Sequence, residues 1–116
     1  MDNLNNLFQE LYKNFNDRNI DLVISKMTDT VKWANGMEGG YVYGHAGVKE
    51  YWTRQFSLIC SMVTPLQVKA AGGQVIINVR QVVHDLEGNL LNDEITEHIF
   101  HLLDDKISEF NIRKRS

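Results

Sequence analysis

The chain has 116 residues, a length that corresponds to a single domain, residues 1–116. Hydrophobic residues make up 43% of it and charged residues 23%, which is ordinary for a globular protein. The net charge of −3 argues against a nucleic-acid-binding protein, because that class needs clustered basic residues on its surface.

A single cysteine, Cys60, lies in an apolar stretch that we expect to be helical. It has no partner for an internal disulfide or for a zinc site built on paired cysteines. The sequence contains no run of about 18 apolar residues, so we expect no membrane span and no membrane partner. The N-terminus lacks the basic start and apolar run of a signal peptide, and we therefore expect a cytoplasmic location.

Two amphipathic helices are predicted at the start of the chain. Apolar residues from Leu4 to Phe15 recur at the three- and four-residue spacing of one buried face, which predicts a helix over residues 3–16. A polar run ends this helix. Asn19 is then placed to cap a second, shorter helix whose apolar face ends at Met27.

The segment 33–52 has an unusual composition, with both tryptophans, three of the four tyrosines and five of the eight glycines. Short strands are predicted over residues 31–34 and 41–43, with a glycine-rich loop between them. A third helix should follow over residues 46–59. Aromatic, glycine and isolated polar residues between a strand and a helix indicate the rim of a pocket.

From residue 63 onward, turn signals divide the chain into four predicted strands: residues 63–71, 74–86, 90–103 and 106–114. Connections this short join antiparallel neighbours, so the strands should form a meander. Two of them exceed ten residues, which implies a strongly curved sheet. Three N-terminal helices on one face of a curved antiparallel sheet give a cone-shaped α+β barrel, and a cone leaves a cavity.

Side chains alternate along strands, so position sorts them by face. The odd positions of residues 74–86 are the more apolar set and should face the helices. A short turn brings the even positions of the next strand to the same face. In the third helix, Gln55 interrupts the apolar stripe. The polar residues expected around the cavity are therefore Gln55, Gln81, Glu94, Thr96 and His98.

Each of these residues also has a purely structural interpretation. His98 could be a hydrogen-bonded core residue, and Gln55 and Gln81 could bond each other or a buried water. Their coincidence around one cavity favours ligand contact for His98 and Gln55. No HExxH, CxxC or paired-histidine spacing occurs, so we expect no metal site and no cofactor.

The opposite face of the sheet carries charged and apolar residues side by side. It should pair Arg80 with acidic residues such as Asp93 and Glu97. It also exposes Ile95 and Ile99. Because isoleucines on the back of a curved sheet are often buried by a second subunit, we expect a homodimer through this outer face.

Three stretches of the sequence resemble the nuclear transport factor 2-like superfamily, which includes ketosteroid isomerase and the SnoaL-like polyketide cyclases. They are LYKNFNDRNIDLVISKMTDTVKW, GGYVYGHAGVKEYW and the end of the meander, HIFHLLDDKISEFNIRKR. A tryptophan-bearing strand, a GxYxG-like step and a helix are typical of SnoaL-like members. The resemblance implies a cystatin-like fold over nearly the whole chain, but this fold hosts many chemistries.

Transfer of the ketosteroid isomerase site to this sequence is incomplete. That enzyme uses an aspartate base and an oxyanion hole of a tyrosine and a protonated aspartate. The base position falls on Asn35 or Ala34, neither of which can take a proton. The oxyanion aspartate position matches His98, whereas the tyrosine position falls near Leu11, with Tyr12 rotated about 100° around the helix. The resemblance therefore implies a different reaction based on His98, or none.

Three functions stay open at this point. In an enzyme, His98 would be the general acid/base for isomerisation, cyclisation or dehydration beside a carbonyl. The same cone could bind a small apolar or aromatic molecule without chemistry, or it could be a dimerisation module with a filled core. The expected substrate-binding residues are Trp33, Asn35, Met37, Tyr41, Trp52, Gln55, Gln81 and Phe100, with Met37 and Glu38 at the mouth of the pocket.

Overall fold

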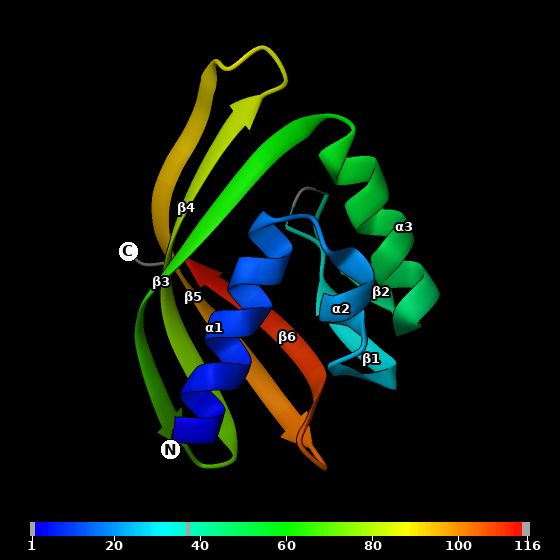
Figure 1. Cartoon of the computed structure of the whole chain (residues 1–116), viewed down its shortest axis with the longest axis vertical. Coiled ribbons are helices and arrows are strands. Elements are labelled where there is room, and N and C mark those ends of the chain that lie inside the picture. The colour runs from blue at the N-terminus through cyan, green and yellow to red at the C-terminus, as the bar shows by residue number, and fades with distance from the viewer. Residues whose placement is uncertain (1, 37, 115–116) are drawn as a thin grey trace.

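The structure is a computed structural model that describes residues 2–36 and 38–114. Helices on one side and strands on the other form two layers (Figure 1). No described helix is long and apolar enough to cross a lipid bilayer. In chain order the elements are α1 (Asp2–Asn16), α2 (Ile20–Ile24), β1 (Met27–Ala34), β2 (Tyr41–Tyr43), α3 (Gly44–Phe56), β3 (Ile59–Ala71), β4 (Gln74–Asp85), β5 (Leu90–Leu103) and β6 (Lys106–Lys114).

The six strands form one sheet in the order β2-β1-β6-β5-β4-β3. Strands β3 to β6 pair antiparallel with their neighbours in the chain, which confirms the predicted meander. Strand β1 instead runs parallel to β6, so the sheet is mixed rather than wholly antiparallel. The long segment between these two strands, which contains a helix, allows the parallel pairing. The α+β class is confirmed.

The sheet curves around the helices. Strand β3 runs from the end of α3 along one edge of the sheet, and the β4–β5 hairpin extends past the start of β3 (Figure 1). A register shift lies between Pro65 and Gln67 of β3, where an irregular pairing bends the strand. Since β3 is an edge strand, the missing N–H of Pro65 need not cost a ladder bond.

The concave face of the sheet and the helices share one hydrophobic core. The predicted face of α1 is buried, with Phe8, Leu11 and Tyr12 each 0–4% exposed. Phe8 packs on Phe100 of β5, with ring centroids 4.7 Å apart. Burial of a side chain of this size stabilises the fold by about 1.5–3 kcal/mol, which fixes α1 against the sheet.

Two boundaries differ from the sequence prediction. Helix α3 ends at Phe56, and Ile59 begins β3, so Cys60 lies in a strand and not in a helix. The apolar stretch continues the helical pattern, but Ile59 and Cys60 pair with Asp85 and His84 of β4, and this pairing decides the conformation.

The starts of β1 and α3 and the cap of α2 also differ from the sequence prediction. Strand β1 already begins at Met27, and α3 at Gly44, whose φ of +74° suits a residue without Cβ. Asn19 precedes α2, but its side chain makes no capping hydrogen bond and donates instead to Asn14 Oδ1 at 3.3 Å.

Candidate functional site

A cavity of about 660 Å³ lies between the helices and the concave face of the sheet. Its volume is within the range of about 300–1,000 Å³ that is common for small-molecule sites. Met37, which we expected at its mouth, lies outside the described residues. The other expected catalytic and substrate-binding residues all line the cavity: Trp33, Asn35, Tyr41, Trp52, Gln55, Gln81, His98 and Phe100. Glu38, which we also expected at the mouth, is not among the lining residues.

The register of two strands brings the polar residues of the sheet together. Ile77 pairs with His98, and Gln81 pairs with Glu94, so odd positions of β4 share a face with even positions of β5. This is the predicted arrangement. Thr96 and His98 are 2% and 6% exposed, and Glu94, nearer the end of the strand, is half-buried.

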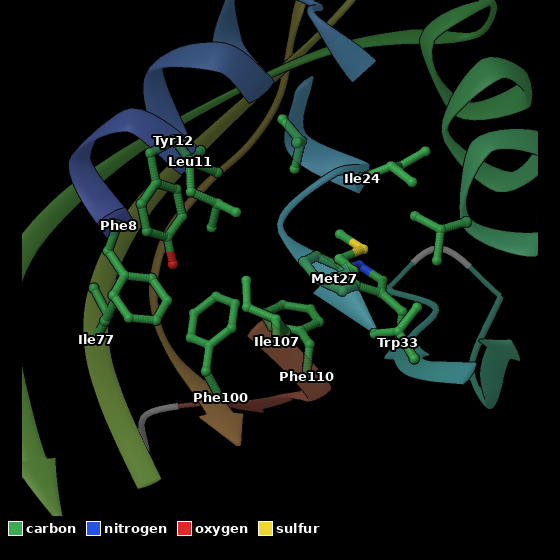
Figure 2. Close-up of a cluster of buried hydrophobic side chains, with 14 of the residues drawn as sticks. Phe8, Leu11, Tyr12, Ile24, Met27, Trp33, Ile77, Phe100, Ile107 and Phe110 are labelled. Carbon is green, nitrogen blue, oxygen red and sulfur yellow. The ribbon is translucent and has the colours of Figure 1, made fainter. Parts of the chain in front are cut away.

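His98 is hydrogen-bonded to a tyrosine of the first helix. The distance from Tyr12 Oη to His98 Nδ1 is 2.8 Å, and both side chains are buried. Tyr12 reaches down from α1 with its hydroxyl oxygen toward the strands that carry Phe100 and Phe110 (Figure 2). The ring of Phe110 meets His98 edge-on, with centroids 4.9 Å apart. These contacts fix the imidazole on the cavity wall.

Burial sets the charge of this pair. It lowers the pKa of His98 to about 3 and raises the pKa of Tyr12 above its ordinary value, because a charged form is poorly solvated there. Both groups are therefore neutral at pH 7.

Tyr12 is the site residue that the sequence analysis missed. We placed it beside the oxyanion position but rotated about 100° around the helix. In the structure Leu11 and Tyr12 are each 4% exposed and both line the cavity. The apolar face of a packed helix is at least about 100° wide, so two consecutive residues can both face inward. The membership of Tyr12 in the predicted apolar stripe was the available signal.

Two buried polar atoms beside the cavity have no hydrogen-bond partner in the part of the chain that the structure describes. They are Oε1 of Gln55, in a residue only 6% exposed, and Oγ1 of Thr96. Gln81 donates to Ser61 Oγ at 2.8 Å, so the expected alternative of a Gln55–Gln81 bond is wrong. An unpaired buried polar group costs about 1–3 kcal/mol, and a ligand can remove that cost.

Aromatic rings form the remaining wall. Trp33 of β1 stacks on Phe110 of β6, with centroids 4.1 Å apart and planes at 23°. Trp52 of α3 meets Trp33 edge-on, with centroids 5.2 Å apart. Each ring is held by its neighbours in an arrangement that aromatic pairs prefer, so the wall offers a fixed apolar surface to a flat ligand.

The loop after β1 is held at the mouth by its own polar groups. Asn35 Oδ1 accepts a hydrogen bond from the backbone N–H of Glu38 at 2.9 Å, and Arg54 of α3 donates to Glu38 Oε1 at 2.6 Å. Tyr41 is 41% exposed and donates to Asn111 Oδ1 at 2.6 Å. Asn35 and Tyr41 therefore shape the rim of the cavity.

The other histidines that the sequence singled out have structural contacts. His45 Nε2 donates to the backbone oxygen of Met27 at 3.0 Å and ties the start of α3 to β1. His101 lies next to Gln74, with 3.3 Å between His101 Nε2 and Gln74 Nε2. Across residues 2–36 and 38–114, no three His, Cys, Asp or Glu residues are grouped to hold a metal ion.

Solved structures with a similar fold are known. No protein family and no curated protein matches the chain. An NTF2-like protein of unknown function from Burkholderia pseudomallei has a TM-score of 0.86 and 19% identity, over 99% of this chain and 92% of that one. TerC, co-crystallised with polyporic acid, has a TM-score of 0.83 and 24% identity, over 95% and 89%.

A third solved structure, a proposed polyketide cyclase from Xanthomonas campestris pv. campestris, has a TM-score of 0.78 and 19% identity, over 96% of this chain and 89% of that one. Proteins with a cystatin fold and with a ketosteroid isomerase-like fold are also similar in structure. The chain therefore has the cystatin-like fold of the NTF2-like and ketosteroid isomerase-like proteins, as the sequence predicted. At these identities the likeness concerns the fold alone.

Proposed function

We propose that the cavity binds a small apolar or aromatic molecule that carries a carbonyl group, and that His98 and Tyr12 act on that carbonyl. The observation behind this proposal is the 2.8 Å hydrogen bond between these two buried side chains on the wall of a cavity of about 660 Å³. The surrounding rings suit a flat apolar ligand, and both members of the pair are buried.

The pair has one proton left to donate in either of its neutral forms. If Tyr12 donates to Nδ1 of His98, the imidazole carries its proton on Nε2. If Nδ1 carries the proton and donates to Tyr12, the hydroxyl proton of Tyr12 is free instead. Either form can donate to a carbonyl oxygen. Neutral donors in a dry site stabilise the negative charge that develops on that oxygen.

The second form supports proton transfer at the adjacent carbon. Tyr12 would donate to the carbonyl oxygen while the unprotonated Nε2 of His98 takes a proton from the α-carbon, leaving an enolate and an imidazolium. The low pKa of His98 in the protein without a ligand opposes this step. With the ligand bound, the negative enolate lies beside the imidazolium and stabilises it. Return of the proton to another carbon completes an isomerisation. Attack of the enolate on a second carbonyl gives a cyclisation.

Among solved structures of the same fold, two proposed polyketide cyclases and an epoxide hydrolase/cyclase-like enzyme of pyran ring formation in salinomycin support a cyclisation. An LEH-like epoxide hydrolase from M. tuberculosis also shares the fold. Others were crystallised with polyporic acid or with trimethylamine. An isomerase, cyclase or dehydratase without a cofactor is the catalytic form of our proposal.

Exchange of α-protons tests the proposal without knowledge of the natural substrate. The C2 protons of 1-tetralone are followed by NMR in D₂O, with and without protein. We expect the protein to accelerate their exchange, Tyr12→Phe to reduce this acceleration about 100-fold, and His98→Leu to abolish it. Glu10→Gln, on the exposed side of α1, is the control and should leave the rate unchanged. Exchange at the buffer rate with saturating bound ketone would exclude catalysis.

Binding without chemistry is the second candidate function. The observation in its favour is the pKa of His98 of about 3, which makes the neutral imidazole a weak base. In this case the Tyr12–His98 pair would only orient the carbonyl oxygen. Ketone binding that Tyr12→Phe weakens, together with an unchanged exchange rate, would identify this function.

We also propose that the protein is a homodimer through the outer face of the sheet. Met62 and Ile95 are 43% and 44% exposed, and Ile76 pairs with Ile99 on the same face. Arg80 donates to both carboxylate oxygens of Asp93 at 2.9 and 2.7 Å nearby, a polar border typical of interfaces. Light scattering should give a dimer mass for the wild type and a monomer mass for Ile95→Lys. A monomer mass for the wild type at a protein concentration about 100 times a nanomolar Kd would contradict the proposal.

The cytoplasmic location stays a prediction.

A further inference from the structure

Formal charge is scarce around the cavity. Among the described lining residues, Glu94 is the one acidic side chain, and no Lys or Arg is present. His98 is neutral there, so it adds no positive charge. A carboxylate or phosphate inside the cavity would lose its hydration without gaining a cation, and it would also meet the charge of Glu94.

Glu94 lies on the same face of β5 as Thr96 and His98, toward the end of the strand. Four residues of extended chain separate the Cα atoms of Glu94 and His98 by about 13 Å. A ligand whose carbonyl reaches Tyr12 and His98 therefore has its other end in the direction of Glu94. The charge at this position acts on whatever substituent the far end carries.

Gln55 favours a ligand that carries a hydrogen-bond donor. Its side chain comes from α3, lines the cavity, and has an enclosed Oε1 that no donor reaches within the described residues. That oxygen can only accept a hydrogen bond. The torsion that turns a glutamine amide is soft, so Oε1 can rotate to the cavity when a ligand offers a donor. Thr96 Oγ1, equally without a partner, lies between His98 and Glu94 and can donate or accept.

We propose that the ligand is uncharged and carries a hydroxyl or N–H group in addition to its carbonyl, with Gln55 as the acceptor of that group and Glu94 as the residue that disfavours anions. This inference rests on the proposed function, which supplies the carbonyl at the Tyr12–His98 pair. The substrate class is thus a hydroxylated or amino-substituted aromatic ketone or enone, and not a carboxylic acid, a phosphate ester or another anion.

A matched set of ligands tests the inference. The Kd values of 1-tetralone and of its 5-hydroxy, 5-methoxy and 5-carboxylate derivatives are measured at pH 7 by ligand-observed NMR. The 5-hydroxy compound should bind about tenfold more tightly than the 5-methoxy compound, the effect of one hydrogen bond. The carboxylate should bind at least tenfold more weakly than the 5-hydroxy compound.

Variants assign the two effects to their residues. Gln55→Leu should remove the difference between the hydroxy and methoxy compounds, and Gln55→Met provides the same comparison if the leucine variant does not fold. Glu94→Gln should strengthen carboxylate binding much more than 5-hydroxy binding, so the ratio of the two Kd values should fall. Glu10→Gln, remote from the cavity, changes the charge equally and should alter neither.

The binding results distinguish a failure of the proposed ligand class from a failure of the proposed carbonyl site. If the carboxylate binds as tightly as the 5-hydroxy compound, or the methoxy compound matches it, the inference is wrong while the carbonyl site stands. If none of the four ketones binds, the proposed function is wrong and the inference fails with it.

Discussion

Tyr12 in the first helix and His98 in the fifth strand are 86 positions apart in the chain, and their side chains are hydrogen-bonded at 2.8 Å inside the core. This contact joins the helical layer to the sheet at the wall of the cavity. Burial lowers the pKa of His98 to about 3, so the imidazole is neutral in these apolar surroundings.

Tyr12 and His98 should contribute to stability as a coupled pair and not independently. Tyr12→Phe leaves His98 Nδ1 buried without a partner, and we expect the free energy of unfolding to fall by about 1–3 kcal/mol. His98→Leu should do the same through the hydroxyl of Tyr12. The double variant removes both polar atoms, so its loss should be smaller than the sum of the single losses. Urea unfolding measures all three, and additive losses would contradict a direct bond.

Stability should decrease in mild acid because of His98. Its pKa is near 6.5 in the unfolded chain and about 3 in the folded protein, so between these values the unfolded state binds the extra proton. The stabilisation is fully present above pH 6.5 and is lost as the pH falls toward 3, with a slope approaching about 1.4 kcal/mol per pH unit.

The control for this pH effect is the Tyr12→Phe/His98→Leu double variant, which keeps the other three histidines. Unfolding is measured by urea from pH 4.5 to 7.5. The wild type should lose stability more steeply than the double variant as the pH falls. Parallel curves would show that His98 is not neutral and buried.

Gln55→Leu should stabilise the protein when no ligand is bound. The unpaired Oε1 carries a desolvation cost that a leucine of similar size avoids, so we expect a gain of about 1–2 kcal/mol in the free energy of unfolding. Gln81→Leu is the matched comparison, since it breaks a bond to Ser61 Oγ and should destabilise. A destabilised Gln55→Leu protein would mean that Gln55 serves the fold rather than a ligand.

The inner face of the sheet was predictable from the sequence because strand alternation is strict. Once Val75 and Ile77 were placed inward, the short turn determined that Thr96 and His98 share their face. The end of α3 was not predictable by the same means. The residues after Phe56 continue a helical pattern, and only pairing with β4 makes them a strand.

Contacts between elements that are distant in the chain could not be predicted from the sequence. The parallel pairing of β1 with β6 depends on how the helices close the sheet, and no local pattern records it. The same holds for the partners of the polar residues. Gln81 bonds Ser61 of the neighbouring strand, and His98 bonds Tyr12 of a helix, because tertiary packing brings these groups within reach.

The most direct test of the central claim is the carbonyl ¹³C resonance of carbonyl-labelled 1-tetralone bound to the protein. If the Tyr12–His98 pair donates its one free proton to the carbonyl oxygen, the bound resonance should lie at or downfield of its position in water, and Tyr12→Phe should move it upfield. A bound resonance upfield of water in the wild type, unchanged by Tyr12→Phe, would mean that the ketone lies in an apolar cavity and that the pair does not contact its oxygen.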